Sequence, residues 1–253
     1  MYLFILVLGL LIGSFLNVCI WRIPRRESIV YPGSHCPKCN TTLKPMDLIP
    51  VFSFLVYRGK CRYCDVKISM QYPIIELMHA MIYLFLYYRY GYSLEFMEYA
   101  LLSSLIIVIS FIDIDHQIIP DGLIWLGFVF AFIFNIHSFF VNFTNLYNSV
   151  LGLLIGGGFF LLIALITNGG MGGGDIKLMG MLGFWLRWKW ILLIMFLSFV
   201  IGAFISVCLI ITKQKGRKDM IPFGPFIGFA TLMTVYYGND IIYYYITYFY
   251  NIG

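Results

Sequence analysis

The stretch FIDIDHQIIPD at residues 111–121 places three carboxylates between two long apolar runs of a chain that is only 11% charged. We interpret Asp121, which follows Pro120 and precedes an apolar run, as a residue that caps a helix start. Asp115 lies in the connection itself and fits a solvated loop. Asp113 differs because it ends an unbroken apolar helix, and acidic residues in such helices are functional candidates by default.

A glycine-rich stretch, GGMGGGD at residues 169–175, ends on Asp175 just before a predicted helix. It lacks the Lys-Ser or Lys-Thr pair of a phosphate-binding loop and no strand precedes it, so we exclude nucleotide binding here. Asp175 fits a helix cap, but a cap does not require five glycines. We expect the glycines to let the backbone approach another segment closely or adopt positive φ.

Asp113 and Asp175 are predicted to lie at the ends of two helices on the same side of one bundle. Two carboxyl groups that share a site divide their roles, because one holds a proton while the other accepts one, as water-mediated peptide hydrolysis requires. A helix C-terminus favours the protonated form of Asp113, and a helix N-terminus favours the ionised form of Asp175. We therefore assign Asp175 as the base that activates water and Asp113 as the acid.

Two C-x-x-C pairs, at residues 36–39 and 61–64, lie in a basic segment. Thiols stay reduced in the cytoplasm, so this pattern indicates a tetrahedral zinc site rather than disulfides. A closed site of four cysteines is structural, because it pins a loop that is too polar to build its own core. The predicted ligands are Cys36, Cys39, Cys61 and Cys64.

The composition requires a membrane to cover the apolar surface. The chain is 61% hydrophobic with a mean hydropathy of +0.87, whereas soluble domains contain about 45–50% apolar and about 25% charged residues. Runs of about 20 apolar residues predict an all-α polytopic membrane protein with about eight transmembrane helices, and turns at residues 91–93 and 142–146. The helices are expected at residues 2–21, 73–90, 94–112, 121–141, 147–167, 176–187, 190–212 and 222–250.

The predicted organisation has three parts. Residues 1–21 form a first transmembrane helix, which we expect to be retained because no A-x-A-like cleavage site follows it. Residues 22–72 form a cytoplasmic zinc-binding loop. Residues 73–253 form the transmembrane bundle that carries the acidic site.

The orientation follows from basic residues, which stay on the cytoplasmic side of a membrane. Nine basic residues against three acidic ones lie between Arg22 and Met70, and the run at residues 213–219 adds four more. The N-terminus is therefore expected outside, with both aspartates on the cytoplasmic side. The same bias explains the basic loop without nucleic acid, and contact with anionic lipid headgroups or substrate is the simpler interpretation.

Five segments resemble type IV prepilin peptidases, in order and over nearly the whole chain. The C-x-x-C pairs together with the G-x-G-D motif are highly specific for that family. The segments are GSFLNVCIWRIP at residues 13–24, CPKCNTTLKPMDLIPVFSFLVYRGKCRYCDVKISMQYPIIEL at 36–77, FIDIDHQIIPD at 111–121, GGGDIKLMGMLG at 172–183 and IPFGPFIG at 221–228.

The resemblance implies an aspartic endopeptidase of the cytoplasmic (inner) membrane, with Asp113 and Asp175 as its catalytic pair. Such enzymes cut the basic leader from prepilins and pseudopilins after a glycine, on the cytoplasmic side. Most also methylate the new N-terminus with S-adenosylmethionine, and the resemblance implies zinc at the four cysteines. Asn17, Arg22 and Glu76 are candidates for lining the methyl-donor site, with interhelical hydrogen bonding and headgroup anchoring as the alternative for them.

Other functions remain open from the sequence. The chain is alternatively a peptidase without methyltransferase activity, or a transporter or channel with Asp113, Asp175 and Glu76 in an ion path. A scaffold that clamps pilin helices through G-x-x-x-G faces at residues 9–13 or 152–156 is a further alternative. His79, three residues after Glu76, is interpreted as part of a hydrogen-bonded interior pair rather than a metal ligand. The particular prepilins, of pilus, competence or secretion systems, are not predicted.

Overall fold

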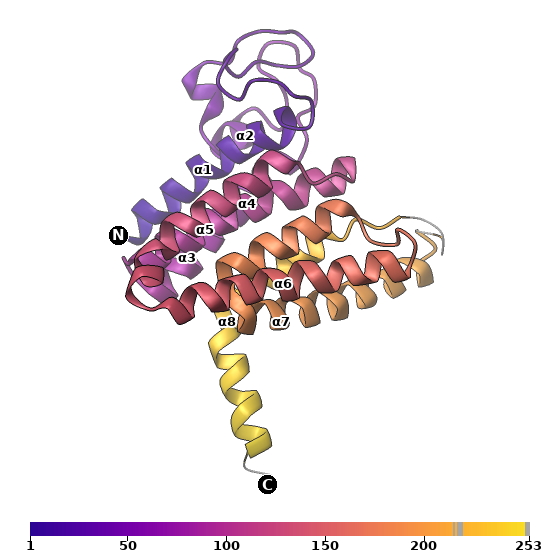
Figure 1. Ribbon diagram of the computed structural model, residues 1–253. Coiled ribbons are helices and arrows are strands. Elements are labelled where there is room, and N and C mark those ends of the chain that lie inside the picture. Colours follow the sequence, from indigo (N-terminus) through magenta and orange to yellow (C-terminus); the bar gives the residue numbers. More distant parts are fainter. Residues whose placement is uncertain (215, 217–219, 251–253) are drawn as a thin grey trace. The chain divides into compact units, whose positions relative to one another are not determined.

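The computed structural model describes residues 1–214, 216 and 220–250. This part of the chain is helical, with two isolated β-bridges and no strand. Residues 215 and 217–219 of the basic run at 213–219 lie outside the described residues. Figure 1 shows the helices, which are α1 (Tyr2–Arg22), the short 3-10 helix η1 (Pro45–Leu48), α2 (Phe52–Val56), α3 (Gln71–Tyr90), α4 (Leu94–His116), α5 (Asp121–Val141), α6 (Phe143–Ile166), α7 (Gly173–Ile211) and α8 (Gly224–Tyr250).

The chain forms two compact units, Met1–Val108 and Ile109–Gly253, with the boundary inside α4. The first unit contains α1, α3, the segment between them and most of α4. The second unit contains the end of α4 and the helices α5 to α8.

Four of the described helices, α1, α4, α6 and α7, are long and apolar enough to cross a membrane. The eight predicted spans are therefore confirmed only in part. Helices α3 and α8 are rich in tyrosine and contain charged residues, which lower their hydropathy. Helix α5 contributes a shorter apolar segment, Asp121–Ile136.

Helix α7 differs from the prediction of two separate helices at residues 176–187 and 190–212. It is assigned as one element of 39 residues, but Arg187 inside it has φ 66° and ψ 172°, which are not helical values. Two helical segments therefore meet at a kink at Arg187, next to the predicted connection.

The predicted turn at residues 142–146 is wrong, because α6 already begins at Phe143. Only Asn142 stays outside the helix, and its side chain accepts a hydrogen bond from the Thr144 amide as an N-cap. The turn predicted at residues 91–93 is confirmed, since it lies between α3 and α4.

In the first unit, α1 packs against α3 through two glycines. A Cβ atom on Gly9 would lie 2.7 Å from Cα of Ala80, and one on Gly13 would lie 2.9 Å from Cα of Glu76. Any larger side chain would push the helices apart. The first G-x-x-x-G face is thus occupied within the chain.

Polar side chains join the helices of the first unit at His79, which is fully buried. Its Nδ1 lies 2.8 Å from the Gly9 carbonyl oxygen and its Nε2 lies 2.9 Å from Oγ of Ser104, which also contacts the Tyr83 hydroxyl. The interior hydrogen bonding predicted for His79 is confirmed, although its partner is not Glu76.

In the second unit, α6 packs against α7 in the same way. The position of a Cβ on Gly152 is filled by the backbone of Gly183, and a Cβ on Gly156 would lie 2.5 Å from the Met179 carbonyl oxygen. The second G-x-x-x-G face is therefore also occupied within the chain, which removes the basis for the scaffold alternative.

The kink in α7 brings a cation to α5 and α6. The guanidinium of Arg187 donates hydrogen bonds to Oδ1 of Asn135 at 3.1 Å, Oγ of Ser138 at 3.0 Å and Oδ1 of Asn145 at 3.2 Å. These bonds satisfy the charge of Arg187 with neutral oxygen atoms and join three helices.

We predict that Gly152→Val lowers the free energy of unfolding by about 1–3 kcal/mol, because the added atoms overpack the contact with Gly183. The matched control is Gly158→Val, which places the same β-branched residue in α6 where no atom lies within 4 Å of the Cβ position. Thermal denaturation in detergent measures both variants. Equal destabilisation by the two would contradict the packing account.

Candidate functional site

Asp113 lies near the C-terminal end of α4 and is 6% exposed. Its Oδ2 accepts a hydrogen bond of 2.9 Å from the amide of Gly224, the first residue of α8. A Cβ atom on Gly224 would lie only 2.7 Å from this oxygen. Glycine is therefore the residue that lets the start of α8 bind this carboxylate.

Asp175 lies in the first turn of α7 and is half-buried. The N-cap of this helix is Gly172, so the predicted capping position of Asp175 is wrong by three residues. Its carboxylate instead turns back towards Gly172. Among the described residues, Oδ1 of Asp175 has no hydrogen-bond partner.

Both predicted aspartates lie in the second unit, close enough for the charge of one carboxyl group to act on the other. One carboxylate is anchored by a backbone amide, while the other keeps one oxygen free of protein partners. This arrangement of Asp113 and Asp175 suits a pair that shares and transfers a proton.

The glycines before Asp175 let the backbone come close to neighbouring atoms, as predicted. A Cβ atom on Gly172 would lie 2.9 Å from Oδ2 of Asp175, and one on Gly174 would lie 2.8 Å from Cβ of Ile119. Gly169, with φ 95°, is the one described glycine of this stretch at positive φ. The backbone here therefore fits around Asp175 and against the segment that precedes α5.

The other two acidic residues of the first motif lie on the surface. Asp121 makes no side-chain cap and forms an exposed ion pair of 2.7 Å with Nζ of Lys177, so its predicted capping role is wrong. Asp115 is exposed as expected, although it lies within α4 rather than in the connection. Neither residue belongs to the buried acidic pair.

The four predicted cysteines form one cluster in the first unit. Their sulfur atoms all lie within 4.8 Å of one another, and Sγ of Cys36 lies 3.8 Å from Sγ of Cys64. Zinc with four Zn–S bonds of about 2.3 Å requires sulfur atoms about 3.8 Å apart. The cysteine cluster, Cys36, Cys39, Cys61 and Cys64, thus has the ligand types and the spacing to hold a tetrahedral zinc ion.

Each half of the cysteine cluster has the same local fold. The amide of Cys36 bonds to the Thr41 carbonyl, and the amide of Cys61 bonds to the Val66 carbonyl. The residues after the second cysteines, Asn40 and Asp65, both have positive φ, 55° and 54°. Asn and Asp tolerate this conformation well, so the sequence supports both turns.

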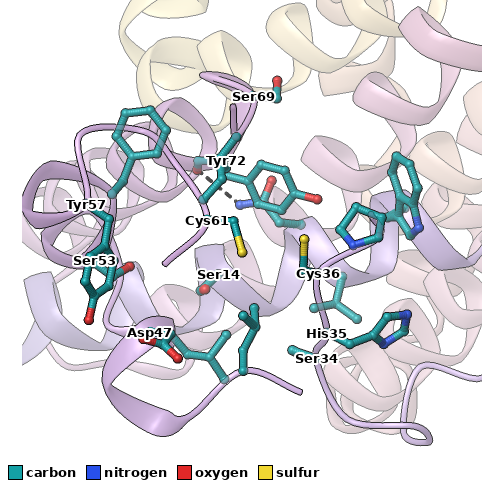
Figure 2. A pocket seen from close by; sticks show the side chains of 18 of the residues that line it. Ser14, Ser34, His35, Cys36, Asp47, Ser53, Tyr57, Cys61, Ser69 and Tyr72 are labelled. Atoms are coloured by element: carbon teal, nitrogen blue, oxygen red, sulfur yellow. Dashed lines mark hydrogen bonds between the residues drawn. The ribbon is translucent and has the colours of Figure 1, made fainter. Parts of the chain in front are cut away.

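A cavity of about 370 Å³ lies beside the cysteine cluster, within the first unit. Figure 2 shows Cys36 and Cys61 approaching each other there, with Asp47 and Tyr57 to one side. The cavity is lined by the end of α1, the start of α3 and the segment between them.

The three residues predicted to line a methyl-donor site, Asn17, Arg22 and Glu76, all line this cavity and are 5–6% exposed. Asn17 donates to the Tyr72 carbonyl oxygen at 3.1 Å, and Glu76 accepts from the Val51 amide at 2.7 Å. The alternative prediction for these residues, hydrogen bonding between elements, is therefore confirmed for Asn17 and Glu76, which join α3 to α1 and to the segment between them.

Asp47 is a residue of this cavity that the sequence alone did not single out. Its Oδ2 accepts hydrogen bonds from the Lys44 amide at 3.0 Å and the Tyr63 hydroxyl at 2.9 Å. Burial opposes ionisation, but these bonds and the nearby charge of Arg62 hold the pKa of the Asp47 carboxyl below its usual range. Asp47 therefore carries a negative charge at neutral pH.

Both units of the chain contain segments that match models of known protein families. Residues 7–90 match the bacterial peptidase A24 N-terminal domain, and residues 100–207 match the type IV leader peptidase family. A protein of Bacillus subtilis (strain 168) named prepilin leader peptidase/N-methyltransferase is 36% identical, over 95% of this chain and 96% of the relative. The chain belongs to the type IV leader peptidase family.

Relatives in other bacteria carry the same name. One from Legionella pneumophila is 32% identical over 98% of this chain and 95% of its own length. One from Pseudomonas aeruginosa is also 32% identical, over 93% of this chain and 90% of its own length. No solved structure matches the chain. Family membership and the apolar helices make this a multi-pass membrane protein.

We predict that the purified protein binds one zinc ion per chain and that a Cys36→Ser/Cys61→Ser variant loses it, because two thiolate ligands are removed. Native mass spectrometry and elemental analysis measure the metal content. Cys208→Ser is the matched control, because Cys208 is an exposed cysteine of α7 outside the cluster. Retention of zinc by the double variant would contradict the assignment.

Proposed function

We propose that the protein removes the basic leader from prepilins and related pseudopilins with Asp113 and Asp175, and then N-methylates the new N-terminus. The observation that carries the peptidase part is that these two residues lie in one unit, close enough for the charge of one to act on the other, in a chain of the leader peptidase family. The curated relatives carry names that join both activities.

We assign the two aspartates the acid and base roles predicted from the helix ends. Oδ1 of Asp175, free of protein partners among the described residues, accepts a proton from the water whose oxygen attacks the scissile carbonyl carbon. Asp113, held by the Gly224 amide, donates its proton to the departing nitrogen. The C–N bond breaks, the leader ends in a carboxylate and the pilin begins with a free amine.

The position of the pair in the chain fits a substrate that arrives at the membrane boundary. Asp113 lies in the last turn of α4 and Asp175 in the first turn of α7, where water is available at a helix end. We place this end on the cytoplasmic side of the inner membrane, and the N-terminus outside, because of the basic segment between α1 and α3.

The methyltransferase part requires a methyl donor and an ordered N-terminal unit. S-adenosylmethionine would supply the methyl group that the new amine accepts, and the candidate residues for its site, Asn17, Arg22 and Glu76, line the cavity beside the cysteine cluster. Zinc held by the cysteine cluster would fix the segment between α1 and α3, so chelation is expected to impair methylation more than cleavage.

We expect Asp113→Asn and Asp175→Asn each to reduce the rate of leader cleavage by about 10²–10⁴-fold, because each removes one partner of the proton transfer. The assay uses proteoliposomes with a prepilin, and mass spectrometry reads the pilin N-terminus. The matched control is Asp121→Asn, whose exposed ion pair contributes little, so its rate should change by less than about twofold.

The same spectra test the two activities separately. Wild-type product should lack the leader and carry the mass of one added methyl group when S-adenosylmethionine is present. Persistent cleavage by either aspartate variant would overturn the catalytic pair. If the wild type cleaves the prepilin but does not methylate the product, the protein is a peptidase without methyltransferase activity. If no cleavage depends on the aspartates, the transporter alternative, with these residues in an ion path, is favoured.

We also expect Gly224→Ala to slow cleavage, because its Cβ would displace the Asp113 carboxylate from the amide that anchors it. Gly158→Ala, at an open position of α6, is the control and should leave the rate unchanged. A Gly224→Ala variant as active as the wild type would show that this contact does not position Asp113.

A further inference from the structure

The cavity beside the cysteine cluster contains a buried carboxylate oxygen without a hydrogen-bond donor. The Asp47 side chain is only 5% exposed, and its Oδ1 has no hydrogen-bond partner among the described residues. The nearest cation, Nη1 of Arg62, lies 3.6 Å away, which is too long for a hydrogen bond. A buried charge without its full set of donors is unfavourable, so a donor from a ligand would stabilise this site.

The cavity also contains a buried cation without an anionic partner. The guanidinium of Arg22 donates hydrogen bonds to the carbonyl oxygens of Ser28 at 2.8 Å and Gly33 at 3.2 Å. No ion pair of Arg22 is present within the described part of the chain. Carbonyl dipoles orient this guanidinium but leave its charge uncompensated, so it favours an anionic ligand group such as a carboxylate.

Besides charged and polar side chains, the lining of the cavity includes aromatic ones. They come from α1, from the segment before α3 and from α3 itself, and aromatic rings are surfaces on which a planar heterocycle can stack. A volume of about 370 Å³ lies within the usual range for small-molecule sites. The aromatic residues that line the cavity are Trp21, Phe54, Tyr57 and Tyr72.

We propose that this cavity is the binding site for S-adenosylmethionine, with Asp47 accepting a hydrogen bond from the ligand and Arg22 binding its carboxylate. The inference rests on the proposed methyltransferase activity. This ligand combines an anionic carboxylate, several N–H and O–H donors and a flat adenine ring, which are the three properties that the lining selects. The cysteine cluster forms part of the wall, since Cys36 and Cys61 line the cavity, as Figure 2 shows.

Isothermal titration of the full-length protein in detergent tests the site with two probes, S-adenosylhomocysteine and 5′-methylthioadenosine, of which the second lacks the carboxylate. Asp47→Asn should weaken binding of S-adenosylhomocysteine by about tenfold or more. The matched control is Asp65→Asn, because Asp65 is an exposed carboxylate at the position that asparagine occupies in the other half of the cysteine cluster. Asp65→Asn should bind both probes as the wild type does.

Arg22→Gln should weaken binding of S-adenosylhomocysteine by about tenfold or more but leave binding of 5′-methylthioadenosine unchanged. Only the first probe has a carboxylate, and the variant removes the guanidinium that would bind it. Unchanged binding of the second probe, together with retained zinc, shows that the variant keeps its fold.

The outcomes separate this inference from the function on which it rests. Wild-type affinity in both Asp47→Asn and Arg22→Gln, from a protein that methylates, would overturn the site and leave the methyltransferase in place. Equal loss of both probes in Arg22→Gln would overturn the carboxylate contact. A wild type that neither methylates nor binds S-adenosylhomocysteine would overturn the site and the methyltransferase together.

Discussion

The hydrogen bond from the Gly224 amide to the Asp113 carboxylate is the contact on which the acidic site depends. A buried carboxyl oxygen without a hydrogen-bond donor is unfavourable, so this bond stabilises the position of the Asp113 side chain. The bond exists because Gly224 has no side chain to occupy the space that the oxygen takes. Gly172 likewise lets the backbone at the start of α7 come close to the Asp175 carboxylate.

Close packing between helices holds the first turns of α7 and α8 in place. Gly152 and Gly183 let α6 and α7 touch backbone to backbone, and Arg187 joins α7 to α5 and α6 through neutral oxygen atoms. In the first unit, Gly9 and Gly13 bring α1 and α3 equally close. The segment between these two helices is polar, and within it the four sulfur atoms of the cysteine cluster come together beside the cavity.

Predictions from the sequence were correct for features that depend on a local residue pattern. They were wrong or absent for residues whose contacts come from distant parts of the chain. Spacing of the C-x-x-C pairs was sufficient to predict the cysteine cluster, and apolar runs located most helices. The role of Asp121 was wrong because Lys177, far along the chain, pairs with it. The contact of Gly224 and the burial of Asp47 were likewise unpredictable, since both arise from segments brought together only in the fold.

The central claim is that Asp113 and Asp175 act as one catalytic unit, and a double-mutant cycle on leader cleavage tests it most directly. Rates of Asp113→Asn, Asp175→Asn and the double variant are compared with the wild type in the same proteoliposomes. Residues that act together are strongly non-additive, so the double variant should be no slower than the slower single variant. If instead the two losses multiply, the aspartates work independently and the shared site is wrong.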